Sequence, residues 1–170
     1  MEYRTTLEHF QNSPLWGYHL PIDTAVAEQF IEGNDRRVRC TINGQETIQA
    51  ALMPHKLVGY FIMTNKKLVT KLGLQAGAAV ELILEKDTSE YGMDMPDELR
   101  ELLNQDEDGS EYFHALTPGK QRSLIYIVAK VKNTNSRLNK SLAIVHHLKE
   151  FKGKIEYKAL NETIKYYNNL

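Results

Sequence analysis

The spacing of apolar residues changes near residue 88, and this change divides the chain into a β part and a helical part. Before it, apolar and polar residues alternate in short runs such as Val38, Cys40 and Ile42, the pattern of half-buried strands. After it, apolar residues such as Leu124 and Val128 recur every three or four positions, which is typical of amphipathic helices. Because the strands precede the long helices, we predict an α+β chain.

Turn and cap signals locate elements within the β part. Asn43-Gly44 separates two alternating runs and predicts a hairpin with a type I′ turn, whose return strand covers residues 45–52. Asn65 is a suitable N-cap for a short helix over residues 66–72, and another short helix is expected over residues 24–31. About six short strands with two short helices predict a small β-barrel.

The helical part contains further start and stop signals. Thr117-Pro118 and Ser136 are expected to begin the two main helices, and Asp106 to Gly109 is expected to interrupt the acidic segment before them. Helical segments are predicted at residues 97–104, 110–116, from 118 onward and at 137–152. The predicted organisation is a small β-barrel domain at 1–88, an acidic linker at 89–95, a helical domain at 96–153 and a C-terminal tail at 154–170.

The net charge of −1 hides three unequal blocks. Residues 1–88 carry 9 basic and 10 acidic groups, residues 89–115 carry 1 and 9, and residues 116–170 carry 11 and 3. If the acidic and basic blocks pair within the chain, the protein has no strongly charged surface. If they stay apart, the basic end is free to bind an anionic partner.

Composition limits the classes of protein to consider. The single cysteine, Cys40, excludes an internal disulfide and a zinc site built from cysteines, and its place in an alternating strand indicates a buried, unreactive thiol. No apolar run approaches the roughly 20 residues of a membrane helix, and the start MEYRTTLEHF lacks a signal-peptide layout, so we predict a cytoplasmic protein. Without a phosphate-binding glycine loop or a nucleophile elbow, we expect neither catalysis nor a cofactor.

The basic block contains the first candidate site. Arg122, Tyr126 and Lys130 follow one another at steps of four on the predicted helix, opposite its apolar face. Together with Arg137 at the start of the next helix, they form a candidate anion or nucleic-acid surface, because an aromatic ring between two cations can stack a base or hold a phosphate. An ordinary solvated face is the alternative interpretation.

A second candidate site is a cleft between the two domains, lined by Trp16, Tyr18, Arg37 and Arg39. Arg37 and Arg39 share the outward face of one strand, which also fits an anion-binding or oligomer surface, or a solvated strand face.

Adjacent histidines, His146 and His147, form no metal site by themselves, because neighbours on a helix point about 100° apart. We expect them on a solvated face, and we predict no metal site.

Two stretches carry a family resemblance. GNDRRVRCTINGQETIQAALMP and GYFIMTNKKLVTKLGLQAGAAVELILEKD resemble a small bacterial domain of unknown function, which implies a double-split β-barrel similar to AbrB-like and MazE-like barrels. MPDELRELLN and FHALTPGKQRSLIYIVAKVKNTNSRLNKSLAIVHHLKEFKG resemble the helical domain called YdeI or OmpD-associated, labelled as bacteriocin protection. The pairing implies a bacterial binding protein connected with stress or antimicrobial-peptide protection.

Three functional hypotheses follow. The first is a non-catalytic binding or interaction protein with a protein or small-molecule partner. The second is a nucleic-acid-binding regulator that uses the basic C-terminal helices, which is less favoured. The third is a small-ligand binder or enzyme with a cleft between barrel and helices. No membrane span is expected, and a homodimer is left open.

Overall fold

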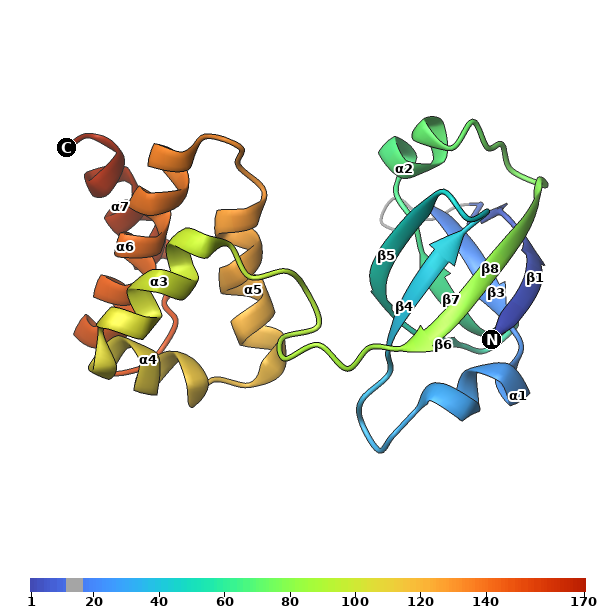
Figure 1. The fold of residues 1–170 in the computed structure, drawn as a ribbon, viewed down its shortest axis with the longest axis horizontal. Coiled ribbons are helices and arrows are strands. Elements are labelled where there is room, and N and C mark those ends of the chain that lie inside the picture. Colours follow the sequence, from blue (N-terminus) through green and yellow to red (C-terminus); the bar gives the residue numbers. More distant parts are fainter. Residues whose placement is uncertain (12–16) are drawn as a thin grey trace. The chain divides into compact units, whose positions relative to one another are not determined.

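The computed structural model describes residues 1–11 and 17–170, and the chain folds into two compact units, Met1–Thr88 and Ser89–Leu170. Strands dominate the first unit and helices make up the second, so the predicted α+β class is confirmed (Figure 1). No helix in the described ranges is long and apolar enough to cross a membrane.

The first unit contains two four-stranded antiparallel sheets. One has the order β1-β8-β4-β5 and consists of β1 (Glu2–Thr6), β8 (Ala79–Lys86), β4 (Arg37–Ile42) and β5 (Glu46–Ala51). The other has the order β2-β3-β7-β6 and consists of β2 (Glu8–His9), β3 (Tyr18–Ile22), β7 (Gly59–Met63) and β6 (Met53–His55). Both sheets contribute to one apolar core, in which Leu20 and Ile62 of the second sheet pack with Val38 and Leu82 of the first. The double-split barrel type stays a prediction.

The β4–β5 hairpin forms as predicted. Asn43 and Gly44 have φ angles of 50° and 64°, which are the positive values that a type I′ turn requires. Alternation along β4 buries Val38 and Cys40, and burial raises the pKa of the Cys40 thiol to about 12. A thiol that stays protonated is a poor nucleophile, so Cys40 packs as a small apolar residue.

The short helices of the first unit lie close to their predicted positions. Asn65 accepts a hydrogen bond from the Leu68 amide at 2.8 Å and begins α2 (Lys66–Lys71), so this cap is confirmed. The helix expected over residues 24–31 is instead a single α-turn, α1 (Thr24–Ala27), followed by a 3₁₀ turn over Glu28–Phe30. Tightening to 3₁₀ geometry is common where a short helix ends.

The second unit, the helical unit, has five helices around one core. They are α3 (Asp97–Gln105), α4 (Glu107–His114), α5 (Pro118–Ala129), α6 (Thr134–Glu150) and α7 (Tyr157–Asn168). Tyr91 and Met95, expected in a linker, belong to this core. The segment expected to be a separate tail forms α7, which packs Leu160 and Ile164 into the same core.

Two helices start earlier than predicted because other side chains cap them. Asp106 accepts from the Gly109 amide at 2.8 Å, so the expected interruption is in fact the start of α4. Asn133 accepts from the Ser136 amide at 3.0 Å, so α6 begins before the cap expected at Ser136. Thr117 occupies the N-cap position of α5, but its side chain makes no capping hydrogen bond.

Candidate functional site

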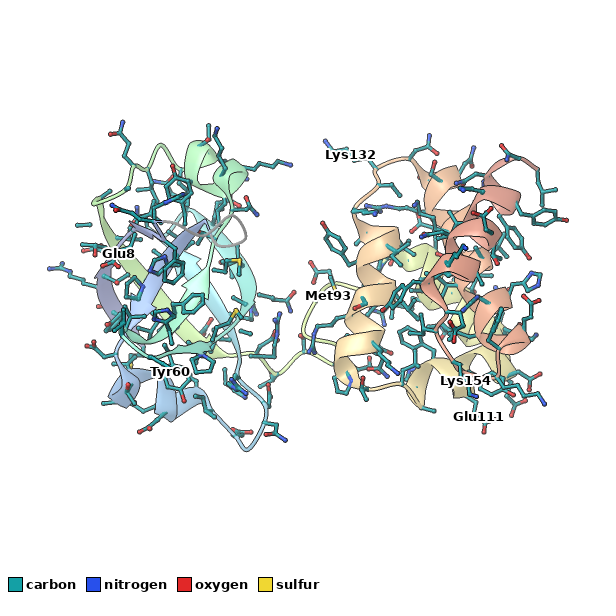
Figure 2. All side chains as sticks on the ribbon, turned by 180° about the vertical axis from the view of Figure 1, so that it is seen from behind. Glu8, Tyr60, Met93, Glu111, Lys132 and Lys154 are labelled. Carbon is teal, nitrogen blue, oxygen red and sulfur yellow. The ribbon has the colours of Figure 1, made fainter. Side chains whose placement is uncertain are left out.

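The end of α5 and the start of α6 form a basic surface, defined here by Tyr126, Lys130, Arg137 and Lys140. A short turn that includes Lys132 joins the two helices, at the far end of the helical unit from Lys154 and Glu111 (Figure 2). Tyr126 is 59% exposed, and the Lys130 ammonium lies 6.0 Å from the centre of its ring. An accessible ring beside a cation offers both apolar contact and charge.

Lys140 is the member of this surface that sequence reasoning missed. It is half-buried, and its pKa is lowered first by burial and then by the positive charge of Lys130. Neither lysine forms an ion pair with a carboxylate in the part of the chain that the structure describes. The two ammonium groups therefore repel each other without a counter-charge at hand.

The two arginines predicted for this surface differ in availability. Arg122 is half-buried, and its Nη1 donates to the Tyr91 carbonyl at 3.4 Å, so it ties α5 to the segment before α3. Arg137 donates from Nε to the Val131 carbonyl at 2.7 Å. That bond uses one of the five N–H groups of the guanidinium, and the two outer nitrogens carry the other four. The basic surface consequently centres on Arg137 rather than Arg122.

Both charge blocks lie within the helical unit. The acidic block contributes 1 basic and 9 acidic residues and the basic block 11 and 3, which gives 12 of each sign. Among the described residues, one ion pair of 4 Å or less joins the blocks, between Lys149 Nζ and Asp106 Oδ2 at 2.8 Å. This pair lowers the pKa of Asp106 and raises that of Lys149. No other ion pair of this length links the two blocks among the described residues, and none involves Lys130, Arg137 or Lys140.

A groove of about 440 Å³ lies between α3, α6 and α7, and we name it the α3–α6–α7 groove. Its apolar lining comes from Leu102, Leu142 and Val145. Its polar lining comes from Asp106, His146, Lys149, Glu150 and Tyr167. The groove is thus formed by three helices, one of which, α7, comes from the segment predicted to be a tail.

The adjacent histidines both connect α6 to the α7 segment. His146 is exposed, as expected for a solvated face, whereas the buried His147 corrects that expectation. His146 Nδ1 lies 2.9 Å from the Tyr167 hydroxyl, near the end of α7. His147 is fully buried, and its Nε2 accepts from the Glu156 amide at 3.1 Å, just before α7 begins. Burial lowers the pKa of His147, which favours the neutral ring that can accept this bond.

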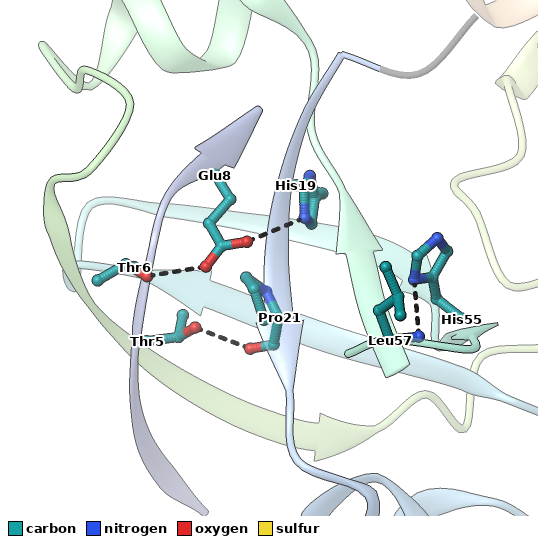
Figure 3. Close-up of polar contacts among 7 residues, drawn as sticks. All are labelled: Thr5, Thr6, Glu8, His19, Pro21, His55 and Leu57. Carbon is teal, nitrogen blue, oxygen red and sulfur yellow. Dashed lines mark hydrogen bonds and ion pairs between the residues drawn. The ribbon is translucent and has the colours of Figure 1, made fainter. Parts of the chain in front are cut away.

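An aromatic cluster on the second sheet of the first unit contains Phe10, His19, His55 and Phe61. His19 is buried and stacks on Phe10 with ring centres 3.6 Å apart, while Phe61 meets it edge-on. Glu8 points toward His19, with Oε2 3.5 Å from Nε2 (Figure 3). Burial nevertheless lowers the pKa of His19, so the neutral ring is favoured.

This cluster does not have the composition of a metal centre. No group of three or more histidine, cysteine or acidic residues is placed to hold a metal ion within the described ranges. His55 uses Nδ1 to accept from the Leu57 amide at 3.3 Å (Figure 3). The arrangement is that of packed aromatic rings, with one stacked pair, Phe10 and His19, and the other ring pairs edge-on or tilted.

Three of the four residues predicted for an interdomain cleft lie in the described part of the chain, and the cleft itself stays a prediction. Trp16 lies outside the described residues. Tyr18 belongs to the second sheet, packs against the core of the first unit and meets His9 edge-on at 4.9 Å. Arg37 and Arg39 lie on the first sheet, on the face of β4 opposite its buried residues, as the alternation predicted.

Two family models match the chain. One, described as Domain of unknown function (DUF1905), matches residues 3–84. The other, described as Bacteriocin-protection, YdeI or OmpD-Associated, matches residues 92–150. A comparison with curated proteins found no match. The two matches confirm the resemblance in both halves: residues 3–84 are similar to the DUF1905 family, and residues 92–150 are similar to the bacteriocin-protection, YdeI or OmpD-associated family.

Proposed function

We propose that this chain is a non-catalytic, cytoplasmic binding protein that holds an acidic segment of a partner protein on its basic surface. The observation that carries the proposal is the half-buried Lys140 beside Lys130, two cations without a carboxylate partner among the described residues. The family description connects one half of the chain with bacteriocin protection, and binding is the contribution we assign to this chain in that role.

A carboxylate is the natural complement of this arrangement. Placed between Lys130 and Lys140, it would add two attractions that outweigh the repulsion between the two ammonium groups. Arg137 adds a planar guanidinium, which binds carboxylates with two parallel hydrogen bonds. Tyr126 offers an exposed ring for the apolar part of the bound segment.

The balance of charge in the helical unit favours a short acidic segment over a nucleic acid. The unit carries 12 basic and 12 acidic residues, so an extended polyanion would leave the basic surface and meet the acidic block. Nucleic-acid affinity depends on many phosphate contacts along the strand. A short protein segment needs only the few cations gathered between α5 and α6.

Fluorescence anisotropy with the full chain tests the proposal. The probe is a short labelled peptide of alternating Glu and Gly, compared with its Gln and Gly counterpart. We expect the double variant Lys130→Ala and Lys140→Ala to weaken binding of the acidic peptide about tenfold. The control is Lys154→Ala with Lys158→Ala, which removes equal charge from exposed positions elsewhere in the unit and should change affinity less than about twofold.

An equal loss of affinity for the acidic peptide in the two double variants would contradict a defined binding surface. Binding of the peptide would then depend only on the net charge of the protein. Tighter binding of a single-stranded oligonucleotide, lost in the Lys130 and Lys140 variant, would replace the proposal by the nucleic-acid hypothesis. Measuring at about 50 mM and about 200 mM salt separates the two, because affinity for nucleic acid falls much more steeply with salt.

A further inference from the structure

We propose that the α3–α6–α7 groove binds a small amphipathic cation, that is, an apolar group joined to an ammonium. The groove is distinct from the basic surface in position and in charge. Its volume of about 440 Å³ lies within the range of small-molecule sites.

The apolar part of the ligand has a defined place. Leu102 of α3 and Leu142 of α6 are half-buried and line the groove together with the buried Val145 of α6. Half-buried leucines in a concave setting present apolar surface that a ligand can remove from water. A phenyl or short alkyl group matches this surface in chemistry and in size.

The charged residues that line the groove indicate whether a ligand should be cationic or anionic. Lys149 and Asp106 are paired at 2.8 Å, and Asp106 also accepts from the Gly109 amide at 2.8 Å. These two charges are therefore already compensated and offer little to a ligand.

Glu150 is the carboxylate of the groove with the weakest compensation. Its side chain is 56% exposed, and its Oε2 lies 3.8 Å from His146 Nε2, beyond hydrogen-bonding distance. The other nitrogen of His146 lies 2.9 Å from the Tyr167 hydroxyl. An ammonium placed beside Glu150 would form a direct ion pair, whereas an anionic ligand would be repelled by the negative charge of this carboxylate.

Nuclear magnetic resonance titration of the full chain tests this assignment with a matched pair of probes. 4-Phenylbutylamine and 4-phenylbutyrate carry the same apolar group and opposite charges. We expect the amine to shift backbone amide resonances of residues that line the groove, in a saturable manner and more strongly than the carboxylate. Shifts spread evenly over both units, or equal affinity for the two probes, would overturn the proposal.

Two substitutions on exposed carboxylates provide the control. Glu150→Gln keeps the size of the side chain and removes its charge, so it should weaken the amine about two- to fivefold and leave the carboxylate probe unweakened. Glu162→Gln removes an exposed carboxylate of α7 that pairs with Lys165 outside the groove, and it should leave the amine affinity unchanged. Equal effects of the two substitutions would refute a specific contact with Glu150.

Discussion

Acidification should loosen α7 from the helical unit through His147. Its Nε2 accepts from the Glu156 amide at 3.1 Å, and a protonated ring has no nitrogen left to accept that bond. The folded-state pKa lies below the ordinary value of 6.5, so the undocked state takes up a proton more readily than the docked state. Stability is therefore complete above about pH 6.5 and decreases as the pH falls below this value.

The size of the effect has an upper limit set by the ordinary pKa. If the His147 ring stays neutral while α7 is docked, lowering the pH from about 7.5 to about 5.5 reduces the free energy of α7 docking by at most about 1.4 kcal/mol. This corresponds to a tenfold rise in the population with α7 undocked. Hydrogen exchange of the α7 amides, corrected for the intrinsic effect of pH on exchange, measures this population. Amides of α5 provide an internal reference, since that helix does not depend on the His147 bond.

Neighbouring histidines supply a matched pair of variants for the same assay. His147→Gln can still accept from Glu156 but cannot be protonated, so the pH dependence of α7 opening should largely disappear. His146→Gln changes the exposed neighbour, and in this variant the opening of α7 should still depend on pH. The reasoning fails if α7 protection in the unaltered chain is independent of pH, or if both variants behave alike.

The caps and the basic surface provide two further predictions. Asn133→Ala should lower the free energy of unfolding by about 1 kcal/mol, because the Ser136 amide loses its acceptor, whereas Thr117→Ala should have little effect. Urea unfolding followed by circular dichroism measures both changes. A larger loss of stability for Thr117→Ala than for Asn133→Ala would show that the cap assignments are wrong. Lys140→Gln should raise the free energy of unfolding by about 0.5 kcal/mol, because it removes a half-buried charge and its repulsion from Lys130, while it weakens binding of the acidic peptide. Lower stability together with unchanged peptide affinity would show that Lys140 is a packing residue.

The features that were predicted correctly from the sequence are mostly turns and helix caps, which depend on a few neighbouring residues. The hairpin at Asn43-Gly44 depends on two adjacent residues that tolerate positive φ, and the α2 cap depends on Asn65 and an amide three residues later. Both are complete within a few positions of the sequence. The start of α6 was predicted late because Asn133 and Ser136 are both good caps, and the sequence alone does not decide between them.

Features that depend on distant residues could not be predicted in the same way. The apolar positions of α7, among them Leu160 and Ile164, are few, and their burial depends on packing against the core of the helical unit. The roles of His146 and His147 depend in turn on α7, because both of their partners lie in or next to that helix. Two histidines that point 100° apart on one helix do not indicate their contacts by themselves, because these contacts depend on which other helix packs beside them.

The arrangement of charge within the helical unit gives the strongest argument that its surfaces are for binding. A unit with 12 charges of each sign could lower its energy by pairing them, yet one described ion pair joins its two blocks. Lys130 and Lys140 instead repel each other. Unfavourable interactions of this kind are common at binding surfaces, because the repulsion in the free protein is offset when a partner of opposite charge binds. The near-neutral total thus conceals a cationic surface between α5 and α6 and an anionic side chain, Glu150, at the α3–α6–α7 groove.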